Sequence, residues 1–253
     1  MKKDLRKQLT ELLKELHLPM FREYHAEYAV KAMNEGLSYE QYLHELAQIE
    51  CDVRRANKIV RLVKASQLPM EKTLENFDLE RLPLRIRQQV KLLQEGSFVN
   101  RCENLLAFGN PGSGKTHLLC GIGHELARQG RRVYFSTCDL IVQQLLRAQR
   151  ELELDKLLKK LSRFEVLMID DFGYVKQDRD EMEVLFTLLA HRYERGSLLL
   201  TSNLPFSKWE VIFKDPMTTA AAIDRLVHHS VVLELNVPSY RAEEAKKRKN
   251  QDK

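Results

Sequence analysis

The apolar residues of the N-terminal part recur at the spacing of amphipathic helices. A helix is predicted over residues 3–16, a second over 21–33, and a third that begins at Ser38. Gln41 stands three residues after Ser38, which is the spacing of a capping box. The first helix places five leucines on one face: Leu5, Leu9, Leu12, Leu13 and Leu16. This part of the chain is therefore predicted to be all-α.

Farther along, short apolar runs alternate with amphipathic segments. Buried strands are predicted at 105–108, 133–136, 166–169, 197–203 and 231–235. Helices are predicted between them at 117–129, 140–161, 181–193, 209–213 and 218–227. Asp139 is expected to cap the helical stretch 140–161, which breaks near Leu154 into two helices. The alternation predicts an α/β domain of three layers, with a central parallel sheet between helices.

These patterns divide the chain into three predicted parts. A small helical domain covers 1–70, the α/β domain covers 71–240, and a basic tail covers 241–253. Residues 72–78 are predicted to be a linker into the second domain. The tail has six basic and three acidic residues and no apolar pattern, so it is predicted to be disordered.

Composition narrows the class of protein. Of 253 residues 43% are hydrophobic, which suffices for a packed core, and the net charge is only +5. No stretch is long and apolar enough to span a membrane, and the charged start, residues 1–6, differs from a signal peptide. The four cysteines show neither a C-x-x-C pair nor zinc spacing. We therefore expect reduced thiols in a cytoplasmic protein.

Residues 109–116 fit the phosphate-binding pattern G-x-x-x-x-G-K-[ST] at every fixed position. A predicted strand precedes them and a predicted helix follows, which is the context that the motif requires and an ordinary Gly/Pro turn does not. Glycines let the backbone approach a polyphosphate, and the helix N-terminus favours the anion. The residues expected to bind ATP are Gly109, Asn110, Pro111, Gly112, Ser113, Gly114, Lys115, Thr116 and His117.

Each polar position of this motif and of the next strands has an expected task. Lys115 would reach the β and γ phosphates, and the Thr116 hydroxyl would take a place on Mg²⁺. Asp170 ends a buried apolar strand, as in a Walker B motif, and would hold the same Mg²⁺. Asp171 would orient or deprotonate the attacking water. Asn203, at the polar end of the fourth strand, could bond the γ-phosphate or that water.

Two groups of basic residues are candidates for DNA binding. The first lies within eleven helical residues that contain no acid: Arg54, Arg55, Lys58, Arg61 and Lys64. The second lies in the two-helix stretch: Lys156, Lys159 and Lys160. Charge alone leaves two interpretations open, a solvated helix face and a surface that contacts DNA phosphates.

The order of these motifs resembles the AAA+ class of P-loop ATPases. The two-helix insertion over 139–163 resembles the clade of bacterial initiators and helicase loaders. Over nearly the whole chain the sequence is similar to the IstB family of insertion-sequence ATP-binding proteins. The residues that carry this likeness are 54–64, 72–78, Asp170–Gly173, Ile223–His228 and Ser239–Arg241.

The resemblance implies ATP and Mg²⁺ as cofactors, binding of double-stranded DNA, and a homo-oligomer formed through AAA+ interfaces. It also implies a partner transposase that the protein assists in choosing and capturing target DNA. Arg225 is the residue that would complete the active site of a neighbouring subunit; the alternative is an internal ion pair with an acid such as Asp224. Arg241 is a weaker candidate for a lid-borne arginine. Asp171 stands where many relatives have Glu, so slow hydrolysis is expected.

Two other functions compete with this one. A loader of the replicative helicase, similar to DnaC over the ATPase part, would share most motifs. A metabolic P-loop enzyme such as a nucleotide kinase would need a second substrate pocket and an arginine-rich lid, for which the sequence gives no sign.

Overall fold

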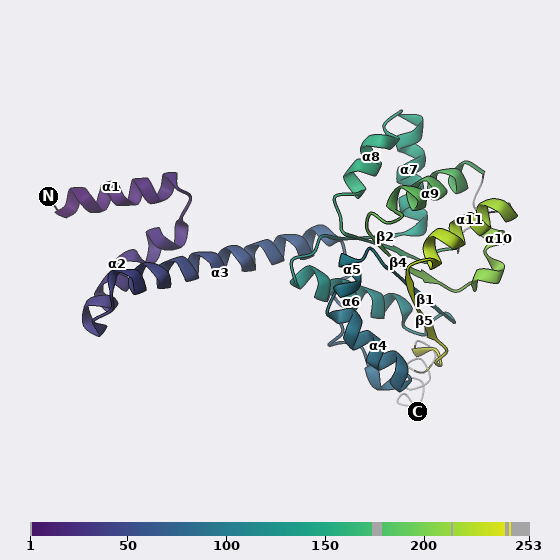
Figure 1. The fold of residues 1–253 in the computed structure, drawn as a ribbon, viewed down its shortest axis with the longest axis horizontal. Coiled ribbons are helices and arrows are strands. Elements are labelled where there is room, and N and C mark those ends of the chain that lie inside the picture. The colour runs from purple at the N-terminus through teal and green to yellow at the C-terminus, as the bar shows by residue number, and fades with distance from the viewer. Residues whose placement is uncertain (1, 174–178, 214, 241–242, 244–253) are drawn as a thin grey trace, which may run out of the picture. The chain divides into compact units, whose positions relative to one another are not determined.

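The computed structural model describes residues 2–173, 179–213, 215–240 and 243. It divides the chain into two compact units, Met1–Arg61 and Leu62–Lys253, each described here by itself (Figure 1). Arg241 and, apart from Glu243, the predicted tail lie outside the described residues. No helix in the described ranges is both long and apolar enough to cross a bilayer.

The first unit is built from helices α1 (Lys2–Glu15), α2 (Pro19–Glu35) and most of α3 (Tyr39–Ser66). The predicted capping box at the start of α3 is confirmed. The Ser38 N–H donates to Oε1 of Gln41 at 2.8 Å, and the Gln41 N–H donates to Oγ of Ser38 at 3.1 Å. Together the two side chains satisfy main-chain donors that the first turn of the helix leaves without partners.

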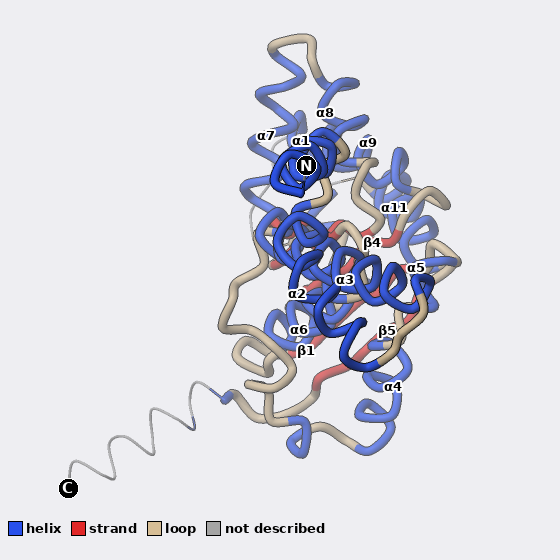
Figure 2. The backbone as a smooth tube through the Cα atoms, turned by 90° about the vertical axis from the view of Figure 1, so that its left-hand side faces the viewer, coloured by secondary structure: helices blue, strands red, loops and turns tan. Residues whose placement is uncertain are grey.

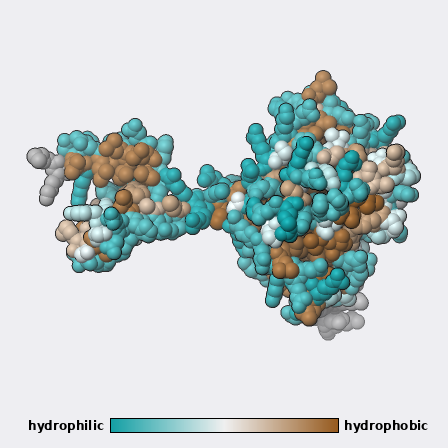
Figure 3. Space-filling model, in the orientation of Figure 1, coloured by the Kyte–Doolittle hydropathy of each residue, from teal (hydrophilic) through white to brown (hydrophobic). Residues whose placement is uncertain are grey.

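The leucine face of α1 is only partly buried. Leu13 is 8% exposed, whereas Leu5 and Leu16 are 67% and 64% exposed. Figure 3 shows apolar (brown) surface over this helix. The sequence thus predicts the helix correctly, but the first unit by itself does not bury the apolar face.

The second unit has a sheet of five strands in the order β2-β3-β4-β1-β5, with every neighbouring pair parallel. This confirms the predicted α/β class. The strands are β1 (Asn104–Gly109), β2 (Val133–Thr137), β3 (Val166–Asp170), β4 (Ser197–Ser202) and β5 (Ser230–Leu235). The helices are η1 (Leu79–Arg81), α4 (Leu84–Gln94), α5 (Ser97–Asn100), α6 (Lys115–Arg128), α7 (Cys138–Arg150), α8 (Leu154–Leu161), α9 (Arg179–Arg192), η2 (Phe206–Lys208), α10 (Glu210–Phe213) and α11 (Pro216–Val227).

Side chains alternate between the two faces of this sheet. On β1, Leu105 and Ala107 join a core with α4, α5 and α6, whereas Leu106 joins a core with α7 to α11. On β3, Met168 and Ile169 divide in the same way. The period of two in a strand produces this division, and both faces must be covered because both are apolar. In Figure 2 the strands (red) lie between the two sets of helices.

The start of α7 differs from its prediction. Thr137, not Asp139, is the N-cap: its Oγ1 accepts a hydrogen bond from the Leu140 N–H at 3.4 Å, and the helix begins at Cys138. Thr137 ends β2 with extended backbone, which is the conformation that an N-cap needs. The carboxylate of Asp139 accepts from the side chain of Gln143 instead.

The prediction of a linker over 72–78 is wrong. The ring of His117 hydrogen-bonds the main-chain oxygen of Thr73 at 2.8 Å. The side chain of Leu74 packs so close to Gly121 that a Cβ on this glycine would lie only 2.7 Å from it. The polar composition of the segment suggested a linker, but its Thr73, Leu74 and Phe77 pack against helix α6.

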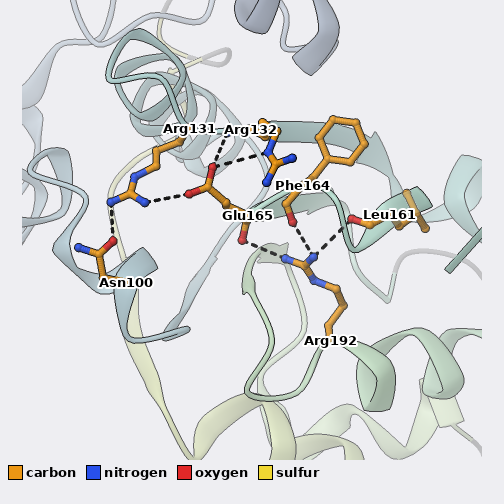
Figure 4. A network of polar contacts seen from close by, with 7 residues as sticks. All are labelled: Asn100, Arg131, Arg132, Leu161, Phe164, Glu165 and Arg192. Carbon is orange, nitrogen blue, oxygen red and sulfur yellow. Dashed lines mark hydrogen bonds and ion pairs between the residues drawn. The ribbon is translucent and has the colours of Figure 1, made fainter. Parts of the chain in front are cut away.

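A buried guanidinium joins the amino-terminal ends of β3 and β4. Arg192 is 1% exposed and donates to the main-chain oxygens of Phe164 at 2.7 Å and Glu165 at 3.0 Å, with a longer bond to Leu161 (Figure 4). It also donates to the main-chain oxygen of Ser197 at 3.0 Å. Burial lowers the pKa of this guanidinium to about 10, so it stays charged at neutral pH. Four carbonyl dipoles therefore take the place of a carboxylate partner.

We predict that Arg192→Met lowers the free energy of unfolding by about 3–5 kcal/mol, because several buried carbonyls lose their donor at once. The measurement is urea unfolding followed by the fluorescence of Trp209, the single tryptophan, which is buried in the same unit. The exposed neighbour Arg195 is the matched control, and Arg195→Met should change stability by less than about 0.5 kcal/mol. Equal stability of both variants would contradict this account.

Candidate functional site

The carboxyl ends of β1, β3 and β4 border a cavity of about 630 Å³. The loop between β1 and α6 lines it with residues 111–117, and the ends of β3 and β4 contribute Asp170, Asp171 and Asn203. Two further segments supply the remaining lining residues, which are Lys72, Asn76, Phe77, Asp78, Arg81, Leu82, Val237 and Tyr240. The site therefore combines the predicted motifs with two segments that the sequence did not connect to it.

The glycines of the loop are required by close contacts. Gly112 and Gly114 have φ of +81° and +93°, which favours glycine. A Cβ on Gly112 would lie 2.1 Å from Oγ of Ser239, and one on Gly114 would lie 2.7 Å from the ring of Phe77. Any larger residue would be strained and would also push these neighbours away from the loop.

Lys115 is held in place by the loop itself and by β4. It is 5% exposed, and Nζ donates to the main-chain oxygens of Gly109 and Asn110 at 2.9 Å each and to Oδ1 of Asn203 at 2.7 Å. Gly109 and Asn110 thus act through their carbonyls rather than by lining the cavity. The ammonium group lies beside the cavity with its three N–H groups engaged, so it must exchange one of these bonds to meet an anion.

Asp170 is the centre of a second set of hydrogen bonds. Its Oδ1 accepts from Oγ1 of Thr116 at 2.8 Å and from Oγ1 of Thr201 at 2.5 Å, and the residue is 6% exposed. Thr201 also accepts from the Asp171 N–H at 2.9 Å. One buried hydroxyl therefore positions both adjacent aspartates, a role of Thr201 that its place in the strand did not reveal.

The two aspartates have different surroundings. Asp171 has a φ of +56° and is exposed, whereas Asp170 is buried. The left-handed turn at Asp171 lets its carboxylate leave the strand direction while Asp170 points to the loop helix. This separation suits one carboxylate for holding a cation and the other for contact with water.

The oxygen atoms beside the cavity fit a hard cation such as Mg²⁺. The Thr116 hydroxyl and the Asp170 carboxylate lie within 2.8 Å of each other, and oxygen ligands with negative charge are what this ion prefers. A magnesium ion brought by ATP would take these two groups, with the remaining positions left to phosphate oxygens and water.

Two more loop residues take defined places. The ring of His117 lies edge-on to Phe77, 5.2 Å between centroids, and bonds Thr73, so it fixes the 72–78 segment as well as lining the cavity. The Ser113 hydroxyl is buried and finds no hydrogen-bond partner among the described residues. A ligand oxygen in the loop would satisfy it.

Comparison with known proteins identifies the chain. Residues 11–249 match the family model described as IstB-like ATP binding protein. The chain belongs to this family. With its loop and paired aspartates, this IstB-like protein is an ATP-binding P-loop ATPase.

Relatives match over most of their length. A protein of Sinorhizobium fredii, named for ATP binding in an insertion sequence, is 40% identical over 92% of this chain and 79% of its own. The corresponding protein of insertion sequence IS5376 from Geobacillus stearothermophilus is 36% identical over 98% of this chain and 99% of its own. The solved DnaC helicase loader is similar in fold, with a TM-score of 0.54 and 18% identity over 65% of this chain and 97% of that chain.

Arg225 does not line the cavity of its own chain. It lies on α11, where its guanidinium donates to the Ala221 oxygen at 3.3 Å and stands 4.7 Å from the centroid of the Phe186 ring. Within the described ranges no carboxylate, Asp224 included, comes within ion-pair distance of it. Its described contacts are therefore the Ala221 oxygen and the Phe186 ring.

The predicted basic groups of the IstB-like protein are partly neutralised. Arg54 pairs with the buried Glu50 at 2.6 Å, Arg55 pairs with Asp52 at 3.3 Å, and Glu50 also accepts from the Met20 N–H. Arg54 and Arg55 are thus ion-paired within α3, because acids one turn earlier on the helix reach them. Lys156 similarly pairs with Glu153 at 2.9 Å. Exposed members with no ion pair to a described residue remain: Lys58, Arg61, Lys64, Lys159 and Lys160.

We predict that Thr201→Val, which keeps the shape but loses the hydroxyl, slows ATP hydrolysis roughly 10–100-fold, as for other residues that orient a metal ligand. Thr201→Ser keeps the hydroxyl and should retain most of the activity. Phosphate release measures turnover, and titration with ATP shows that both variants still bind it. Turnover of Thr201→Val equal to that of the unchanged protein would mean that this hydroxyl does not position Asp170.

Proposed function

We propose that this protein binds double-stranded DNA under the control of ATP and assists the transposase of an insertion sequence in choosing and capturing target DNA, in the cytoplasm. The observation that supports it most is the IstB-like family match over residues 11–249. The names of the two relatives add an insertion-sequence context.

At the nucleotide site, each side chain has a place in the proposed cycle. Lys115 would meet the β and γ phosphates, and Thr116 and Asp170 would hold Mg²⁺, which supplies charge stabilisation to the phosphates. Asp171 would orient the attacking water, and Asn203 would bond the γ-phosphate or that water once Lys115 turns to the nucleotide. Because Asp is one methylene shorter than Glu, slow turnover is expected, so that bound ATP persists as a signal.

DNA would be held through phosphate contacts and without sequence preference. The support is the exposed charge of Lys58, Arg61 and Lys64 on α3, which pair with no acid in the described ranges, with Lys159 and Lys160 on α8 as a second surface. Arg54 is better assigned a structural role in the first unit, since it forms an ion pair with the buried Glu50. A helicase-loader function has less support, because the likeness to DnaC is one of fold alone.

Subunits would assemble through AAA+ interfaces, with Arg225 of one completing the site of the next. An arginine suits this task because its charge is permanent and its fork meets phosphate oxygens bidentately. Its absence from the lining of its own cavity and its lack of a described carboxylate partner both favour a role in trans.

We predict that the triple change of Lys58, Arg61 and Lys64 to Ala weakens binding to all duplex sequences alike. The slope of log affinity against log salt should become shallower by about 0.9 for each DNA phosphate that the variant no longer neutralises. Fluorescence anisotropy of labelled duplexes at several salt concentrations measures both quantities in the presence of ATP. The matched control removes the same charge elsewhere, by changing the exposed Arg85, Lys91 and Lys208 to Ala. If the two triple variants behave alike, α3 is only a solvated face.

We predict that Arg225→Ala binds ATP but fails to hydrolyse it, and that Lys115→Ala fails because its own pocket cannot hold ATP. Mixed together, the two should recover part of the activity, since an Arg225→Ala pocket can face an intact Arg225 from its neighbour. An arginine supplied in trans can be worth about 10³–10⁵ in rate. Both variants are first shown to fold and to co-assemble. A mixture that stays inactive, while added unchanged subunits restore activity, would rule out action across the interface.

A further inference from the structure

The chain after β5 folds back onto the phosphate-binding loop. The Tyr240 N–H donates to the Gly112 oxygen at 2.9 Å, and Ser239 fills the space beside Gly112 that a Cβ would need. Val237 and Tyr240 line the cavity. The segment 237–240 is therefore a wall of the nucleotide site, attached to the loop by a main-chain bond.

The side chain of Arg81 holds the segment 237–240 in place. Arg81 donates to the Pro238 oxygen at 3.2 Å, pairs with Glu243 at 2.9 Å, and stands with its guanidinium 5.0 Å from the centroid of the Tyr240 ring. Arg81 is itself fixed at the end of η1, whose N-cap Asp78 accepts from the Glu80 N–H. Three different kinds of contact thus converge from one guanidinium on a short segment.

The chemistry of the cavity changes along its length. Toward the ends of β3 and β4 it offers an ammonium, a hydroxyl and two carboxylates, which suit phosphates and a cation. The segments 72–82 and 237–240 add the apolar side chains Phe77, Leu82 and Val237 and the ring of Tyr240, which is 50% exposed, beside the polar Lys72, Asn76, Asp78 and Arg81. A triphosphate alone gains nothing from the apolar groups, whereas a flat heteroaromatic ring does.

We propose that Tyr240 stacks on the base of the bound nucleotide and that Arg81 is the residue that positions Tyr240 for this contact. The inference rests on the proposed binding of ATP in this cavity. The cation over the Tyr240 ring and the bond to Gly112 fix the ring before the nucleotide arrives, so less rotational freedom is lost on stacking. Nucleotide binding and the seating of the C-terminal segment on the loop are then mutually reinforcing.

The test compares ATP with inorganic tripolyphosphate, which carries the phosphates but no base, by calorimetric titration of the full chain. Tyr240→Ala should bind ATP roughly 5- to 100-fold more weakly, the range expected for loss of one base–aromatic stack, and bind tripolyphosphate unchanged within about twofold. Tyr240→Phe should bind ATP normally. Tyr240→Leu keeps apolar volume without the ring and should resemble Tyr240→Ala.

Arg81→Ala should weaken ATP in the same selective way, and Arg81→Lys should restore part of the affinity. Tyr39→Ala, at a 94% exposed tyrosine of the first unit, is the matched control and should leave both ligands unaffected. Trp209 fluorescence during unfolding checks that each variant is folded.

Equal weakening of ATP and tripolyphosphate by Tyr240→Ala and Tyr240→Leu, or no weakening of either, would overturn the stacking role. Unchanged ATP binding in Arg81→Ala, or equal weakening of ATP and tripolyphosphate, would overturn the positioning role. Lys115→Ala distinguishes a failure of the stacking proposal from a failure of the proposed nucleotide site. If this variant binds both ligands like the unchanged protein, the proposed nucleotide site itself is wrong.

Discussion

One carboxylate oxygen, Oδ1 of Asp170, ties together the three elements that make the site. Asp170 is the last residue of β3, and this oxygen accepts hydrogen bonds from Oγ1 of Thr116 at the start of α6 and from Oγ1 of Thr201 on β4. A buried carboxylate is costly unless its oxygens are hydrogen-bonded, so both hydroxyls are needed to keep it there. The loop helix and the two strand ends are therefore fixed to one another.

The other end of the same strands is fixed by a buried charge of opposite sign. Arg192 binds the main chain where β3 and β4 begin, and Asp170 and Thr201 bind each other where they end. Because the strands are held at both ends and buried on both faces, the carboxylate of Asp170 has little freedom to move. Such rigidity is what a site needs if it is to stabilise charge without reorganising during the reaction.

The walls of the cavity differ in how firmly they are built. The inner wall consists of buried strand ends, whereas the outer wall consists of segments 72–82 and 237–240, held by contacts such as that of Tyr240 with Gly112. Local opening of a protein begins where few buried contacts must be broken. Segment 237–240 can therefore open more easily than segment 72–82, which packs on α6, or than the strand ends around Asp170.

Local patterns in the sequence determined most of the fold and the centre of the site. The five strands, the phosphate loop, the break between α7 and α8 and the capping box at Ser38 all depend on residues close together in the chain, where periodicity and turn chemistry decide the structure. Contacts between distant segments were decided only by the tertiary structure. No local pattern connects Arg81 with Tyr240, and the polar composition of 72–78 concealed its packing on α6. The charge count likewise concealed that Arg54 is bonded to Glu50, since a count of charges does not contain the positions of their partners. These features depend on which surfaces meet once the sheet has formed, and sequence spacing carries no information about that.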